Sequence, residues 1–210
     1  MKKSVIYVKD FSFIYENNEY TFDEILKKHM FFKNLKIIIL EEMLYIKSFF
    51  IESKMKDIEG YVLNKIEEIF PQNDEILYSY ESSPKKDSIY IYSIKGREKV
   101  ERLCEKATSL QVIPIQFMLR DCINKKTNSK KEGFIAIAEL YDRFYFIESE
   151  NGVFIDNYIS DSIIDFQEYL KEKVIHRKIY MDEKLNIDEY IQGKTEIIKI
   201  DIARLVNEKV

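Results

Sequence analysis

Two short polar breaks between apolar strands hold the residues best placed for chemistry. The first break, residues 8–11, reads Val-Lys-Asp-Phe, and the second, residues 139–143, reads Glu-Leu-Tyr-Asp-Arg. A break of this kind cradles a phosphate when glycines expose its backbone N–H groups and an aspartate holds the metal ion. Aspartates are present, but neither break contains a glycine. A side chain such as Phe11 or Leu140 would crowd a phosphate there, so we expect no bound nucleotide.

Other groups of residues that could act in catalysis or metal binding give only weak signals in the sequence. His29 and His176 have no second histidine at helical spacing, so each is interpreted as a structural or surface residue. The adjacent acids at 41–42 and 182–183 are interpreted as solvated edges. Walker, G-x-S-x-G and H-E-x-x-H motifs are absent from the sequence. We therefore predict no catalytic residue, no cofactor and no metal site.

Composition favours a packed cytoplasmic protein. Of 210 residues, 46% are hydrophobic and 33% charged, which is too apolar for a disordered chain. The net charge of −4 argues against general affinity for nucleic acid. Cys104 and Cys122 are expected to be buried free thiols, as in a reducing compartment. The apolar run at the N-terminus is too short for a signal peptide, and charges interrupt residues 35–51, so no segment is expected to span a membrane.

The two breaks belong to a pattern that occurs twice, over residues 4–40 and 133–181. Each copy is three short strands joined by tight turns, then an amphipathic helix and a further strand. In the second copy the turn is marked by Asn151-Gly152, a pair that tolerates positive φ. This duplication predicts an α/β protein with mixed sheets and the actin-like, or ribonuclease H-like, fold of two β-β-β-α-β lobes.

The domain organisation follows from the same pattern. We predict a first lobe over 1–124, a polar linker over 125–132 and a second lobe over 133–210. The first lobe carries an inserted α+β subdomain at about 42–95. We expect strands near 43–52, 75–81, 88–95 and 110–114 in the first lobe and near 195–200 at the end of the second, and helices near 54–70, 97–109, 116–124, 162–174 and 186–191.

The chain resembles the PilM and GspL cytoplasmic-domain family in the order and apolar pattern of several segments. Residues 35–52 resemble a buried strand followed by the strand that enters the family's inserted subdomain, and 61–71 resemble its helix, which ends at a proline. Residues 88–103 resemble the following strand and helix. Residues 133–140 occupy the place of a strand that carries A-x-x-D-x-G in the family.

This resemblance implies an actin-like scaffold of type IV pilus or type II secretion machines, at the cytoplasmic side of the inner membrane. PilM proteins often keep a nucleotide site, whereas GspL-type domains have lost it. The chain lacks glycine at both breaks and again after Tyr180, which favours the GspL-like condition. The resemblance implies two partners, the cytoplasmic tail of an inner-membrane subunit and the assembly ATPase, and it allows a membrane-anchored longer protein.

Three functions are weighed: a non-catalytic scaffold, a divergent actin-like ATPase or kinase, and a nucleic-acid-associated accessory protein. We favour the scaffold, with no nucleic acid as partner, and we leave open a homo-oligomer. Because a strand packs only one face on the helix of the insertion, its other face or an edge is free to bind a peptide. The predicted partner-binding aromatics are Tyr45, Phe49, Tyr78, Tyr80, Tyr90 and Tyr92. The alternative is that these side chains complete the core.

Overall fold

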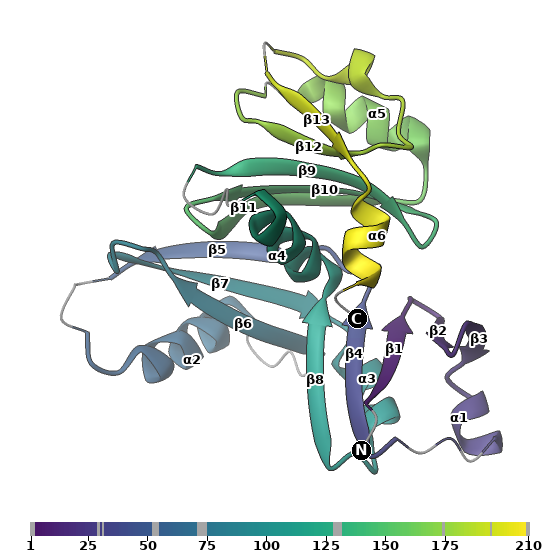
Figure 1. Ribbon diagram of the computed structural model, residues 1–210. Helices are drawn as coiled ribbons and strands as arrows, with labels where there is room; N and C mark the ends of the chain where they lie inside the picture. The colour runs from purple at the N-terminus through teal and green to yellow at the C-terminus, as the bar shows by residue number, and fades with distance from the viewer. Residues whose placement is uncertain are drawn as a thin grey trace.

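The computed structural model describes residues 3–28, 30, 32–51, 55–70, 75–127, 132–173, 175–193 and 195–208. Two five-stranded sheets and one three-stranded sheet form its framework (Figure 1). The first sheet contains β1 (Ser4–Val8), β2 (Ser12–Tyr15), β3 (Asn18–Thr21), β4 (Asn34–Ile39) and β8 (Ser109–Pro114). The second contains β9 (Phe134–Leu140), β10 (Arg143–Glu150), β11 (Val153–Ser160), β12 (Ile179–Asp182) and β13 (Ile197–Ile200).

The two large sheets have the same strand order. The first runs β3-β2-β1-β4-β8 and the second β11-β10-β9-β12-β13. In each, the first three strands of the copy are antiparallel neighbours, and the last two strands run parallel to the first. The central strands β4 and β9 are mostly apolar and buried, because both of their faces are covered. The predicted duplication of an α/β lobe is confirmed.

Helices complete each lobe at matching places. α5 (Ile163–Glu172) follows β11, and the single-turn α1 (Glu24–Lys27) follows β3. α4 (Ile115–Thr127) and α6 (Ile202–Asn207) follow the last strand of each sheet and pack against each other between the lobes (Figure 1). The short helix predicted near 186–191 is a single 3-10 turn, η2 (Asp188–Tyr190). Ser162 caps α5 by accepting a hydrogen bond from the Asp165 N–H.

An inserted subdomain leaves the first lobe after β4. It contains β5 (Tyr45–Phe50), α2 (Ile58–Ile69), β6 (Ile76–Ser82) and β7 (Ser88–Lys95), and its sheet has the order β5-β7-β6. α2 covers one face, where Val62 and Ile66 pack with Ile89 and Ile91 in a small core of their own. The other face turns toward α4 and the second lobe. The insertion expected from the sequence is therefore present.

Two predicted boundaries are corrected. The helix expected over 97–109 is α3 (Arg97–Cys104), because residues from Ser109 onward pair with β4 as β8. The polar linker expected over 125–132 begins later, since 125–127 complete α4. Its remaining part, 128–131, lies outside the described residues.

Three hairpins turn through two consecutive residues with positive φ. The pairs are Glu16-Asn17, Tyr141-Asp142 and Asn151-Gly152. Two such residues define the type I′ turn, whose twist matches the twist of the strands on either side. The turn predicted at 151–152 is confirmed, whereas the others adopt the same geometry without glycine. A non-glycine residue in this conformation carries a steric penalty that glycine avoids.

Asn157 in β11 pins the second lobe to the start of the insertion. Its side-chain amide accepts a hydrogen bond from the Leu44 N–H and donates one to the Leu44 carbonyl, both at 2.8 Å. The amide thus pairs with a backbone as a neighbouring strand would. Because this contact is buried, its loss leaves a donor and an acceptor of Leu44 unsatisfied.

We expect Asp142→Gly to stabilise the protein by about 0.5–1 kcal/mol, because φ at this turn position is +61°. Asn17→Gly, at the matching position of the β2–β3 hairpin, should change stability in the same direction. Urea denaturation of the two variants measures the effect. A loss of stability in both would contradict the assigned turn type.

We expect Asn157→Ala to reduce the free energy of unfolding by on the order of 3 kcal/mol, since two buried backbone groups lose their partner. Asn18→Ala is the control, because the Asn18 amide bonds only an exposed carbonyl, that of Glu16. The control should stay within about 0.5 kcal/mol of the parent. Equal midpoints in urea for both variants would show that Asn157 does not join the lobes.

Candidate functional site

The first polar break is engaged by the chain itself. The N–H of Asp10 donates to the Glu41 carboxylate at 2.7 Å, and the ammonium of Lys99 lies 2.9 Å from the Asp10 carboxylate. Phe11 points into solvent, with 89% of its surface exposed. A phosphate at this turn would need the same backbone N–H. The first break therefore offers Glu41 the donor that a phosphate would take.

The second polar break reaches the same carboxylate from the other lobe. Arg143, at the start of β10, lies 2.9 Å from Glu41 and 2.9 Å from Asp161. Burial alone would lower the pKa of Arg143, but the two carboxylates raise it overall, so the guanidinium stays charged. Glu41 thus holds both breaks at once, one through a backbone N–H and one through a guanidinium.

Further contacts join the lobes beside Glu41. Within the first lobe, Lys99 also pairs with Glu42 at 3.2 Å. The rings of Tyr7 and Tyr141 lie 4.8 Å apart, and the Tyr145 hydroxyl donates to the Leu40 carbonyl. Side chains of this protein therefore bridge the two lobes where the turns between the first two strands of each lobe meet.

Two acids interpreted from the sequence as solvated are buried. The Glu41 side chain is 8% exposed, and Asp182 is 1% exposed at the end of β12. Asp182 accepts hydrogen bonds from the N–H groups of Lys184 and Ala203. Both acids follow the carboxyl ends of parallel strands, where buried backbone N–H groups need acceptors. The edge interpretation was wrong for these residues because sequence spacing does not show which loops meet.

The remaining chemical candidates are placed as follows. Cys104 is half-buried and Cys122 buried, and both are free thiols. His176 is exposed, and His29 lies outside the described residues. Among the residues that the structure describes, no cluster of His, Cys, Asp or Glu has the form of a metal site. Within that same part of the chain, no helix is long and apolar enough to cross a membrane.

A small apolar groove lies between the insertion and the first lobe. Its volume is about 130 Å³, and it is lined by Leu44, Leu77, Tyr78, Ser79, Tyr92, Ile94, Val112, Pro114 and Phe117. Two strand edges meet there, because β6 is paired with β7 alone and β8 with β4 alone in the described ranges. An extended peptide can add to an unpaired edge through main-chain hydrogen bonds and place side chains in a neighbouring pocket.

The structure divides the predicted partner-binding aromatics. Tyr78 and Tyr92 line the groove. Tyr45, Tyr78 and Tyr80 are exposed, and register places all three on the face of the sheet that carries α2, so Tyr78 borders the groove from the edge strand β6. Phe49 packs edge-on against Tyr61 of α2. Tyr92 is only 1% exposed, so its role is in the core and the groove wall.

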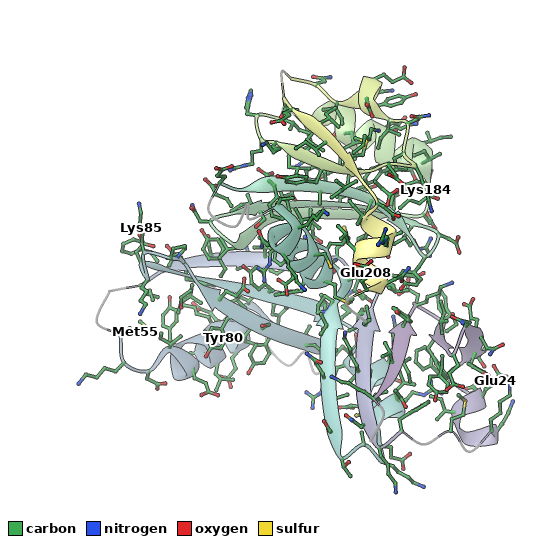
Figure 2. All side chains as sticks on the ribbon, in the orientation of Figure 1. Glu24, Met55, Tyr80, Lys85, Lys184 and Glu208 are labelled. Atoms are coloured by element: carbon green, nitrogen blue, oxygen red, sulfur yellow. The ribbon has the colours of Figure 1, made fainter. Side chains whose placement is uncertain are left out.

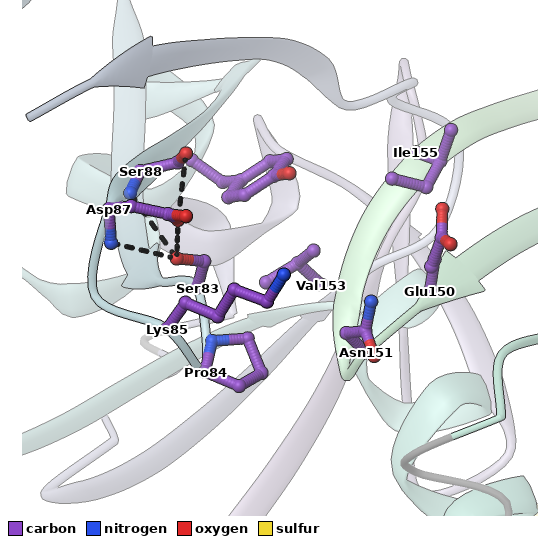
Figure 3. Close-up of a pocket in the computed structure, with 10 residues that line it drawn as sticks. Ser83, Pro84, Lys85, Asp87, Ser88, Glu150, Asn151, Val153 and Ile155 are labelled. Carbon is purple, nitrogen blue, oxygen red and sulfur yellow. Dashed lines mark hydrogen bonds between the residues drawn. The ribbon is translucent and has the colours of Figure 1, made fainter.

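Tyr90 lines a different pocket, of about 200 Å³, between the β6–β7 and β10–β11 hairpins (Figure 3). Ser83 and Ser88 hold the Asp87 carboxylate on one side, and Lys85 extends toward the β10–β11 hairpin. These polar groups mainly satisfy one another within a loop. The sequence reasoning did not find the first-lobe part of the apolar groove, Val112, Pro114 and Phe117, because they come from a different segment of the chain.

Comparison with known proteins rests on structure. No protein-family model matches the sequence, and no curated protein matches it. A Bacteroides thetaiotaomicron protein with an actin-like ATPase fold and unknown function superposes with a TM-score of 0.56 at 12% identity, over 98% of this chain and 95% of that one.

The cytoplasmic domain of EpsL, an inner-membrane component of the type II secretion system of Vibrio cholerae, superposes with a TM-score of 0.53 at 11% identity, over 99% of this chain and 93% of that one. The PilM–PilN type IV pilus biogenesis complex matches with a TM-score of 0.45 at 8% identity, over 80% of this chain and 61% of that one. The fold class predicted from the sequence is confirmed by the Bacteroides thetaiotaomicron protein and the EpsL domain. The chain has the actin-like fold, and the EpsL cytoplasmic domain is among its structural neighbours.

Proposed function

We propose that this chain is a non-catalytic cytoplasmic scaffold of a type IV pilus or type II secretion assembly platform, which links inner-membrane subunits to the assembly ATPase. The similarity to the EpsL cytoplasmic domain supports the setting, although a fold can serve many functions and the site must carry the argument. The single observation that carries the proposal is that Glu41 engages both polar breaks.

The engagement of Glu41 favours a scaffold over a nucleotide enzyme. A phosphate would be repelled by the Glu41 carboxylate and would compete with it for the Asp10 N–H and for Arg143. Displacing Glu41 would also leave its carboxylate, 8% exposed, without two of its partners. Closed contacts between the lobes suit a protein that presents fixed surfaces.

The groove beside β6 is the surface we assign to a membrane partner. Its lining is apolar apart from Ser79 and the tyrosine hydroxyls, and two unpaired edges flank it. It therefore suits a short extended peptide with an apolar side chain, such as the cytoplasmic tail of an inner-membrane subunit. Ser79 is exposed and lies on the groove face of β6, opposite Tyr92 in register, so it is the position most available to that peptide.

Millimolar Mg-ATP is expected to leave the melting temperature unchanged. A ligand at 100 times its Kd would add about 2.7 kcal/mol of stability, which is several degrees for a chain of this size. The measurement is thermal unfolding with Mg-ATP, against Mg²⁺ alone as control. A rise of several degrees would favour the alternative function, a divergent actin-like ATPase or kinase.

Ser79→Glu should weaken binding of the partner's tail by roughly tenfold or more, because it places a charge on the groove face of β6, opposite Tyr92 in register. The assay uses synthetic peptides with the cytoplasmic-tail sequences of the membrane subunits encoded beside this chain, titrated by fluorescence anisotropy. Tyr80→Glu, on the other face of β6, tests the wider set of aromatics.

Ile164→Glu is the matched control, since Ile164 is an exposed apolar residue on α5 of the second lobe. It should leave binding unchanged. If Ser79→Glu binds every peptide as the parent does, the docking site lies elsewhere on the molecule.

A further inference from the structure

Tyr92 lines the groove and also packs against the second lobe. Its ring lines the groove, and the same ring packs edge-on against Phe117 of α4 at 5.4 Å and Phe154 of β11 at 5.5 Å. Phe117 and Phe154 in turn pack against each other at 4.9 Å. The three rings therefore connect the insertion, the first lobe and the second lobe.

The Tyr92 hydroxyl is hydrogen-bonded to the backbone of the second lobe. It accepts a hydrogen bond from the Phe154 N–H and donates one to Glu81 of β6, both at 3.1 Å. Burial raises the pKa of Tyr92 well above its ordinary value, so the hydroxyl keeps its proton and can donate. A movement of the ring shifts both bonds together.

Arg120 of α4 completes the connection. Its guanidinium donates two hydrogen bonds to the Glu81 carboxylate, at 2.6 and 2.7 Å, and one to the Gly152 carbonyl at 2.9 Å. It also lies over the rings of Phe117 and Phe154. The turn of the β10–β11 hairpin, at Gly152, is thus held by Arg120, whose guanidinium also pairs with the carboxylate that accepts from Tyr92.

The neighbouring part of this interface is open. The pocket of about 200 Å³ separates the β6–β7 hairpin from Asn151, Val153 and Ile155 of the β10–β11 hairpin (Figure 3). Space beside a hairpin gives it room to shift, and the polar contacts of Tyr92, Glu81 and Arg120 restrain it at one side.

We propose that the groove and the β10–β11 hairpin form one coupled conformational device, in which a side chain seated in the groove fixes the Tyr92 ring and tightens the hairpin against the insertion. This inference rests on the proposed function in using the same groove, and it holds for any occupant that presses on Tyr92. When the groove is filled, the β10–β11 hairpin of the second lobe changes position. The second lobe then presents a different surface to other subunits.

Ser79→Trp tests the coupling without a partner. Ser79 lies opposite Tyr92 in register and lines the groove, so an indole at this position occupies the groove itself. Amide hydrogen exchange followed by NMR gives a direct readout, because the Phe154 N–H donates to the Tyr92 hydroxyl. We expect exchange at Phe154 to slow by roughly tenfold, the effect of strengthening one hydrogen-bonded contact.

Tyr80→Trp is the matched control, since Tyr80 lies on the opposite face of the same strand. It should leave exchange at Phe154 unchanged. Tyr92→Phe removes the acceptor, so exchange at Phe154 should rise by roughly five- to tenfold, and adding Ser79→Trp should no longer slow it. Ser79→Phe replaces the tryptophan variant if the latter unfolds.

Equal exchange at Phe154 in the parent and in the folded groove-filling variant would overturn the coupling, as would an equal effect of Tyr80→Trp. This outcome is separable from failure of the scaffold proposal. If no membrane-subunit tail binds while Ser79→Trp slows exchange, the coupling stands and the proposed partner is wrong. If tails bind while exchange is unchanged, the partner stands and the coupling is wrong.

Discussion

A buried guanidinium constrains how the three parts of this protein fit together. The Arg120 side chain is only 8% exposed, and a charge at such depth is tolerated only when its hydrogen bonds are satisfied. Its partners come from three places: Glu81 from the insertion, the Gly152 carbonyl from the second lobe, and the ring of Phe117 from its own helix. The insertion, α4 and the second lobe must therefore meet at one point. The groove lies beside this point, because Tyr92, which donates to Glu81, and Phe117, whose ring lies under Arg120, both line it.

The contacts of Glu41 apply the same rule at another part of the lobe junction. A carboxylate that is 8% exposed needs donors, and it finds one in each polar break, the Asp10 N–H and Arg143. In a protein that binds phosphate at these turns, the donors would be left free for the ligand. In this chain both donors contact an internal carboxylate, that of Glu41. The view of all side chains shows how densely they fill the region between the ribbons (Figure 2).

The strands and turns of the fold are local properties, and most were predictable. Apolar and aromatic runs such as those of β10 and β11, together with Asn151-Gly152, specify a hairpin from neighbouring residues alone. Boundaries failed where tertiary pairing overrode local preference: the segment after Cys104 was predicted as helix because its charges suit one, but the pairing of Ser109 with Asn34 makes it the approach to a strand. The candidate site was less predictable. Tyr78 was found from its place in an aromatic strand, whereas Pro114 and Phe117 reach the groove from a segment more than thirty residues away.

The sequence by itself determined the duplicated lobe, the insertion and the loss of glycine at both polar breaks. These are patterns of residue type along the chain. The spacing of apolar residues predicts the strands and helices, and the presence or absence of glycine predicts how closely a ligand can approach the backbone. Only the tertiary structure decided that Glu41 is buried between the breaks, that Tyr92 is a wall and not an exposed contact, and that β6 and β8 leave their edges beside one groove. The physical reason is that burial and charge pairing depend on which loops and edges meet, and these meetings join residues such as Glu81 and Arg120 that the sequence holds far apart.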